Sequence, residues 1–217
     1  MIQGSPRGRP NVALIGAVRG LVAESAAVVA ALDELRPEVV GVGVSFEELT
    51  GLRDYFVGPS VEPLVPLTTS ETAEARALTR FGPVGVPHPA FLAGVAWAES
   101  RRVTVEPLDP SDESFASSFA ENVSYLELVR RTLRERNLAR QPPESPTAEE
   151  FAVDWDLRLT PGAGSARLTA RREQELAESV ERLSAGGRRV VGIVDYERYA
   201  GVMGRLESRS PDARAAP

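Results

Sequence analysis

Apolar residues form short continuous runs that alternate with segments of helical periodicity. Residues 12–16, 38–44 and 189–194 are rich in Val, Ile and Gly and predict buried strands, and the alternating residues 102–107 predict another. A strand, a helix and a second strand follow one another between residues 11 and 45, which is typical of a parallel unit with a right-handed crossover. The pattern predicts an α/β fold: one domain with a mixed, mainly parallel sheet flanked by helices.

Apolar positions at a spacing of three or four residues predict the helices. The first covers residues 24–36 and is stopped by Pro37, and a later one covers residues 167–184 and ends at two glycines. The longest covers residues 115–140, with an apolar face made of Phe115, Phe119, Val123, Leu126, Val129 and Leu133. Shorter helices are predicted over residues 47–55, 69–79 (capped by Thr69 or Ser70), 92–99 and 199–206.

The two ends of the chain lack this patterning. Residues 1–10 and 208–217 are polar and predict flexible tails, which leaves residues 11–207 as the domain. Residues 57–67 hold three prolines and predict an irregular segment.

Composition limits the classes of function. The formal net charge is −6 and the pI is about 5.1, which disfavours a nucleic acid as partner because phosphates need a basic surface. The absence of cysteine excludes disulfides, thiolate nucleophiles and Cys-based metal sites. The start of the chain is polar, and no apolar run is long enough for a membrane helix. We therefore expect a cytoplasmic protein without a membrane partner.

Arginines stand at three places where chemistry is expected. Arg19 and Arg198 each follow a predicted strand and precede a helix, where backbone N–H groups favour anions. Arg172 interrupts the apolar stripe of the helix over residues 167–184, so it needs a carboxylate or a bound anion as partner unless it extends to solvent. Candidate carboxylates near strand ends are Glu47, Glu48, Glu106 and Asp109. The alternative is that Arg19 and Arg198 are paired with surface carboxylates.

Other catalytic motifs are weak. The turn GAVRG lacks both the dinucleotide-binding glycine pattern and the P-loop lysine, so no cofactor is predicted. His88 is the single histidine, which excludes a histidine metal cluster within one chain, and its Pro-flanked segment is not a nucleophile elbow.

Three stretches together suggest a family. VALIGAVRG, ESAAVVAALDEL and RPEVVGVGVS open the domain, RREQELA lies in a late helix, and VVGIVDYERYAGV leads a strand through a turn into the last helix. In their order and spacing these stretches resemble the TraB/PrgY and Tiki superfamily, relatives of the ChaN and erythromycin-esterase folds. The resemblance implies an α/β fold with a site at two histidine turns, which in Tiki-type members looks like a metal-dependent protease centre.

The positions that carry this chemistry differ in the present chain. Arg19 and Arg198 stand at the two histidine positions, Gly43 at the family glutamate, and Arg172 at the family arginine. A permanent cation repels a metal ion where a neutral imidazole would bind it. The resemblance therefore implies the fold and the location of the site, without the family's metal chemistry.

We therefore predict a non-catalytic, TraB/Tiki-like domain whose arginine-lined cleft binds a small anion or an acidic peptide. The residues predicted to bind it are Arg19, Arg172, Arg198, Glu47 and Glu48. One alternative is a metal-dependent hydrolase that uses Glu47, Glu48 or Glu106. The other is a structural or regulatory protein that associates, for example as a homodimer, through the helix over residues 115–140.

Overall fold

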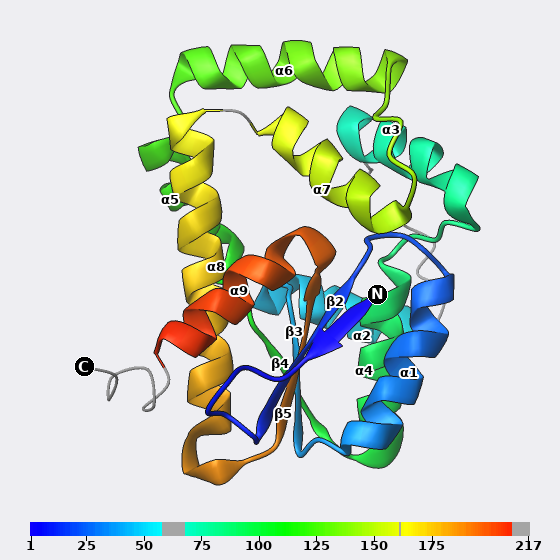
Figure 1. Cartoon of the computed structure of the whole chain (residues 1–217), viewed down its shortest axis with the longest axis vertical. Coiled ribbons are helices and arrows are strands. Elements are labelled where there is room, and N and C mark those ends of the chain that lie inside the picture. Colours follow the sequence, from blue (N-terminus) through cyan, green and yellow to red (C-terminus); the bar gives the residue numbers. More distant parts are fainter. Residues whose placement is uncertain (58–67, 161, 210–217) are drawn as a thin grey trace.

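Five strands form one sheet in the order β1-β2-β5-β3-β4 in the computed structural model, which describes residues 1–57, 68–160 and 162–209 (Figure 1). The strands are β1 (Ile2–Gly4), β2 (Val12–Ala17), β3 (Val39–Val42), β4 (Thr104–Pro107) and β5 (Val190–Asp195). All neighbouring pairs are parallel except β1 and β2. The predicted α/β fold with a mixed, mainly parallel sheet is confirmed.

The N-terminal segment is more ordered than its sequence indicates. Residues 1–10 are predicted to be a flexible tail, yet β1 lies in this segment and pairs antiparallel with β2, with Ile2 opposite Gly16. A strand of three residues is too short for a recognisable apolar pattern, and here the edge of β2 supplies the hydrogen bonds. Of the other segments predicted to be irregular, residues 58–67 and 210–217 lie outside the described residues.

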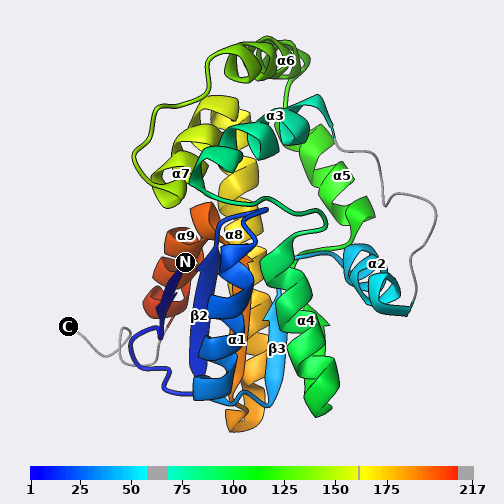
Figure 2. The same ribbon diagram turned by 90° about the vertical axis from the view of Figure 1, so that its right-hand side faces the viewer.

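Two layers of helices cover the sheet (Figure 2). On one face lie α1 (Ala23–Leu35) and α4 (Pro89–Arg101), and on the other lie α8 (Ala163–Ser184) and α9 (Tyr196–Ser208). The helix α2 (Phe46–Val57) follows β3 and contacts β4 and α4. The inner strands β2, β3 and β5 are buried along their whole length, which explains their continuous apolar sequence.

The remaining helices form a cap beyond the carboxyl ends of the parallel strands (Figures 1 and 2). They are α3 (Thr69–Leu78), α5 (Asp112–Asn122), α6 (Tyr125–Arg140) and α7 (Ala148–Leu159), and short 3₁₀ turns cover Thr79–Phe81 and Ala185–Gly187. The cap has its own apolar cluster, in which Phe151 and Trp155 of α7 pack with Leu78 and with Val18 just after β2. This cluster fixes the cap over the end of β2.

The longest predicted helix is in fact two helices. Residues 115–140 divide between α5 and α6, because Val123 is extended and Ser124 starts a new helix. The Ser124 hydroxyl accepts from the Glu127 N–H, and the Glu127 carboxylate accepts from the Ser124 N–H. The Ser-x-x-Glu pattern of this capping box is present in the sequence, but the apolar spacing continues across it and predicts a single helix.

The helix α6 lies at the outside of the cap, and its apolar side chains are exposed. Leu126 and Leu133 keep 56% and 59% of their surface accessible, and only Leu138 is buried in this helix. None of the helices in the described ranges is both long and apolar enough to cross a membrane.

Candidate functional site

The candidate site is built where β2 and β5 end side by side. Ala17 of β2 is in register with Asp195, the last residue of β5. Arg19, two residues beyond Ala17, donates to the Asp195 carboxylate from Nε at 3.3 Å and from Nη2 at 2.8 Å. The parallel pairing thus converts two sequence-distant strand ends into a two-point ion pair.

Asp195 is the centre of this group. Its side chain is 1% exposed, and besides Arg19 it has Arg172 Nη2 at 3.5 Å and His88 Nε2 at 3.5 Å. Burial alone would raise the pKa of Asp195, but Arg19, then His88 and Arg172, hold it well below its usual value. Asp195 is therefore an ionised carboxylate fixed inside the protein.

Arg172 has the partner that its position on an apolar stripe requires. It donates from Nε to both carboxylate oxygens of Asp109, at 2.9 and 3.1 Å, and Nη2 also bonds to Asp109. Asp109 follows β4 and was one of the four predicted candidates. The pair leaves Arg172 directed at the protein's own carboxylates.

Arg198 is the most buried of the three arginines, with 8% of its side chain exposed. It forms an ion pair with Asp156 of α7 and approaches Glu173 of α8 at 4.0 Å. Arg198 therefore connects α9 to the cap. It does not approach Asp195 as Arg19 and Arg172 do, so the three guanidinium groups do not converge on one point.

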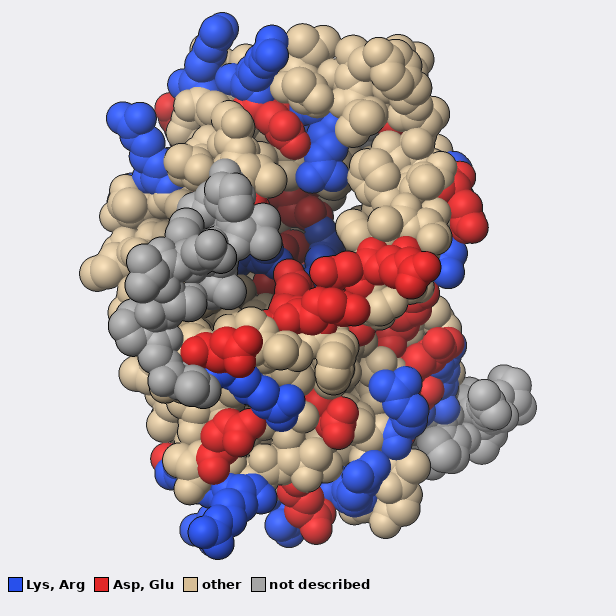
Figure 3. All heavy atoms as spheres, turned by 180° about the vertical axis from the view of Figure 1, so that it is seen from behind, with Lys and Arg blue, Asp and Glu red and all other residues tan. Residues whose placement is uncertain are grey.

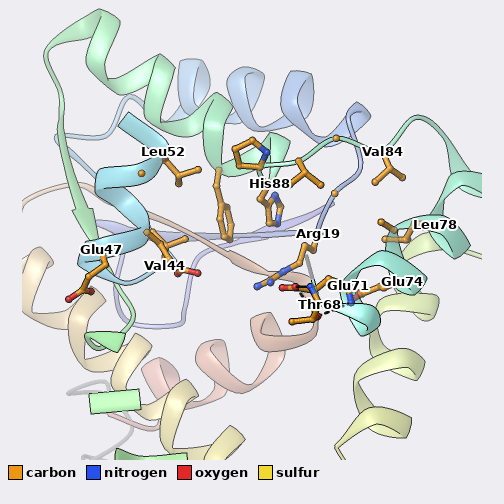
Figure 4. A pocket seen from close by; sticks show the side chains of 18 of the residues that line it. Arg19, Val44, Glu47, Leu52, Thr68, Glu71, Glu74, Leu78, Val84 and His88 are labelled. Atoms are coloured by element: carbon orange, nitrogen blue, oxygen red, sulfur yellow. Dashed lines mark hydrogen bonds between the residues drawn. The ribbon is translucent and has the colours of Figure 1, made fainter. Parts of the chain in front are cut away.

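A cavity of about 550 Å³, called the first cavity, lies between α2, α3 and the start of α4 (Figure 4). Its walls are mainly apolar and include Val44, Leu52, Leu78, Val84 and Phe91. Its charged lining side chains are Arg19, Glu47, Glu48, Glu71, Glu74 and Asp112. In Figure 4, Arg19 and His88 lie between Glu47 on one side and Glu71 and Glu74 on the other.

A second cavity of about 280 Å³ adjoins the first under the cap. Arg172, Arg198 and Glu197 line it, and it shares Arg19, Thr68, Glu71 and Glu74 with the first cavity. Figure 3 shows a hollow across the middle of one face, with basic side chains inside it and acidic side chains along its lower edge. Arg19 is thus the one predicted arginine that lines both cavities.

The predicted glutamates lie in the first cavity, at the start of α2. The Glu48 carboxylate accepts from the Ser45 N–H at 3.1 Å, and the Ser45 hydroxyl accepts from the Glu48 N–H at 3.1 Å. Ser45 is therefore the N-cap of α2, and Glu48 completes a capping box with it. Glu47 is exposed beside it. The structure brings Arg19, Glu47 and Glu48 to one cavity and Arg19, Arg172 and Arg198 to the other.

Two further carboxyl groups have unusual proton affinity. Burial raises the pKa of Glu74 to about 7, against the opposing charge of Arg19. Burial, followed by the charge of Asp195, raises the pKa of Glu197 to about 8. Glu197 is therefore largely protonated at neutral pH, and Glu74 exchanges its proton near neutral pH.

His88 has an unusual environment for a polar side chain. It is 8% exposed, and its ring stacks on Phe91 at 3.9 Å between centroids. Nε2 lies 3.5 Å from the Asp195 carboxylate, which is a long contact, and Nδ1 has no hydrogen-bond partner in the described part of the chain. Burial lowers the pKa of His88, and the nearby Asp195 only partly opposes this, so the ring is neutral at pH 7. Within the residues that the structure describes, no three Asp, Glu or His side chains are arranged to hold a metal ion.

Sequence reasoning missed Asp195 as the centre of the site, and it missed Glu74. Asp195 is the polar residue that ends an apolar run, which is a recognisable signal in a parallel sheet. Glu74 lies on the amphipathic helix α3 and carries no such signal. His88, the single histidine, was predicted to have no catalytic role because its Pro-flanked segment is not a nucleophile elbow.

No protein family matches the chain, and no curated protein is similar to it. The resemblance to the TraB/PrgY and Tiki superfamily therefore stays a prediction.

Proposed function

We propose that this domain binds a small molecule with one anionic group, which contacts Arg19 while its apolar part fills the first cavity. The observation that carries the proposal is that Asp195 engages only one edge of the Arg19 guanidinium group. Asp195 holds Nε and Nη2, whereas Nη1 has no acceptor among the described residues, and 44% of the side chain stays accessible. A fixed guanidinium with a free edge in an apolar cavity is suited to a carboxylate or a phosphate.

The surroundings favour a single negative charge over an acidic peptide. Glu47, Glu48, Glu71 and Asp112 line the same cavity as Arg19 and would repel a second anionic group. The volume of about 550 Å³ lies in the range of small-molecule sites, and the mainly apolar wall suits a ligand with a hydrocarbon or aromatic body.

Binding is proposed in preference to catalysis. The resemblance to the TraB/PrgY and Tiki superfamily would place metal-binding histidines at Arg19 and Arg198, and both are engaged in ion pairs as permanent cations. Their engagement supports a domain that keeps the family's site location and uses it for an anion.

Calorimetric titration with 3-phenylpropanoate, octanoate and inorganic phosphate tests the proposal. We expect at least one carboxylate to bind, and Arg19→Gln to weaken it by about tenfold or more, because a charge-assisted hydrogen bond is lost. Arg76→Gln makes the same change of charge on the exposed side of α3 and should leave the affinity unchanged. Absence of binding by all three probes, with the protein folded, would refute the proposal.

Homodimerisation through α6 is the second candidate, and the exposed apolar side chains of that helix favour it. Leu126, Val129 and Leu133 recur at helical spacing and are 56%, 38% and 59% exposed. Sedimentation should then give a dimer that Leu126→Glu dissociates, while Phe46→Glu, an exposed position on α2, does not. A wild-type monomer at high concentration would rule the dimer out.

A further inference from the structure

Glu74 occupies a position relative to Arg19 that suggests a second contact for the ligand. Both side chains line both cavities, and Figure 4 shows them near one another on the α3 side. Their charges influence each other, yet no ion pair joins them in the part of the chain that the structure describes. Arg19 and Glu74 thus line the same cavities without forming an ion pair with each other.

The charge balance of the first cavity argues for a ligand without net charge. The positive charge of Arg19 is already matched by Asp195. A plain anion would therefore bring an unmatched negative charge among Glu47, Glu48 and Glu71. A ligand that carries its own ammonium group would avoid this cost, because Glu74 could accept that group.

We propose that the ligand is a zwitterion with a bulky apolar side group, such as an amino acid of the leucine or phenylalanine type. Its carboxylate bonds to Arg19, its ammonium bonds to Glu74, and its side group lies against Leu52, Leu78, Val84 and Phe91. This assignment rests on the proposed function, because it uses the same contact with Arg19 and adds one with Glu74.

Three probes of one shape test the assignment: phenylalanine, 3-phenylpropanoate, which lacks the ammonium, and 2-phenylethylamine, which lacks the carboxylate. In calorimetric titrations of the whole chain at pH 7.5, phenylalanine should bind about tenfold or more tightly than either other probe. The same comparison with leucine, 4-methylpentanoate and 3-methylbutylamine covers the aliphatic case.

A variant identifies the second contact. Glu74→Gln keeps the shape of the side chain and should reduce phenylalanine to the affinity of 3-phenylpropanoate. Glu34→Gln, an exposed glutamate of α1 that lines neither cavity, should leave the affinity unchanged. Because Glu74 exchanges its proton near pH 7, wild-type affinity for phenylalanine should rise from pH 6 to pH 7.5, below the pKa of about 8 of the neighbouring Glu197, and this rise should be absent in Glu74→Gln.

The outcomes separate the two proposals. If the acid binds as tightly as the amino acid in both pairs, the zwitterion is refuted while anion binding stands. If the amine binds as tightly as the amino acid, or if no probe binds, both proposals fall. The comparison of probes on the wild type decides the matter even if Glu74→Gln does not fold.

Discussion

Arg19 bonds to Asp195 across the ends of β2 and β5, two strands whose last residues are far apart in the sequence and in register in the sheet. The pair is asymmetric in its exposure. Asp195 is 1% exposed, whereas Arg19 keeps 44% of its side chain accessible in the cavities. The buried Asp195 carboxylate therefore needs its neighbouring cations to stay ionised, while Arg19 can still donate to a ligand.

Asp195→Ala should be among the most destabilising substitutions in the site. It removes the carboxylate that Arg19 and Arg172 share. Because Arg19 is 44% accessible and Arg172 keeps Asp109, we expect a loss of about 1–3 kcal/mol. Chemical unfolding measures the loss. Glu99→Ala removes the partner of Arg53 in an exposed pair and should cost less than about 1 kcal/mol. Equal losses in the two variants would show that Asp195 is not a buried centre.

Stability should fall as pH rises from 5 to 8. The folded-state pKa of Glu197 is about 8 against an ordinary value of 4.5, so in this interval the folded protein keeps a proton that the unfolded chain has released. The contribution is complete below pH 4.5 and is lost as the pH rises through 8, with a slope of at most about 1.4 kcal/mol per pH unit. Solvent access to the partly exposed side chain will reduce this slope.

Unfolding free energies at pH 5, 6, 7 and 8 measure the effect. Glu197→Gln should reduce the slope, most clearly between pH 7 and pH 8 where Glu74, with its pKa of about 7, contributes least, whereas Glu34→Gln should retain the full slope. A profile that is the same in wild type and Glu197→Gln would contradict the assignment.

Two glycines in helices should respond in opposite directions to alanine. A Cβ on Gly94 of α4 would lie 2.4 Å from Ile193 Cδ1 of β5, so Gly94→Ala forces repacking, at a cost of about 1–3 kcal/mol. A Cβ on Gly204 of α9 would meet no atom within 4 Å, so Gly204→Ala should stabilise by about 0.5–1 kcal/mol. Thermal unfolding of the two variants gives both signs, and a stabilising Gly94→Ala would mean that α4 lies farther from the sheet.

The start of α6 depends on Ser124. Ser124→Ala removes the oxygen that accepts from the Glu127 N–H and should destabilise the protein by about 1 kcal/mol. Ser124→Asp, which keeps an acceptor at this position, should restore most of the loss. If Ser124→Ala unfolds at the same temperature as wild type, α5 and α6 do not need the cap to separate.

The strands and the helices that cover them follow from local patterns. Runs such as the one that became β5 are apolar throughout because both faces of the sheet are covered, and Trp155 is apolar core in the cap. Short or polar elements do not follow in this way. The strand β1 depends on an edge that β2 offers, and the cap of α3 is Thr68, one residue before the two predicted candidates.

The sequence indicated where the candidate site lies, but not which of its charged side chains form ion pairs with one another. Strand ends gave the positions of Arg19 and Arg198, and the interrupted stripe gave Arg172 with Asp109 among its candidates. The order of strands decides which ends are neighbours, and no local pattern specifies that order. Glu74 reaches the first cavity from α3, and His88 reaches it from the start of α4. Only the folded chain brings both residues near Arg19.

The position of β5 also constrains how the protein is made. The strand that lies between β2 and β3 is encoded after all the others, and Val12 is paired with Val190. During synthesis β2 and β3 are made before β5, so the edges that β5 will cover stay unpaired until then. The sheet closes only after residue 195 has left the ribosome, so folding is expected to be late, slow and dependent on protection of those edges.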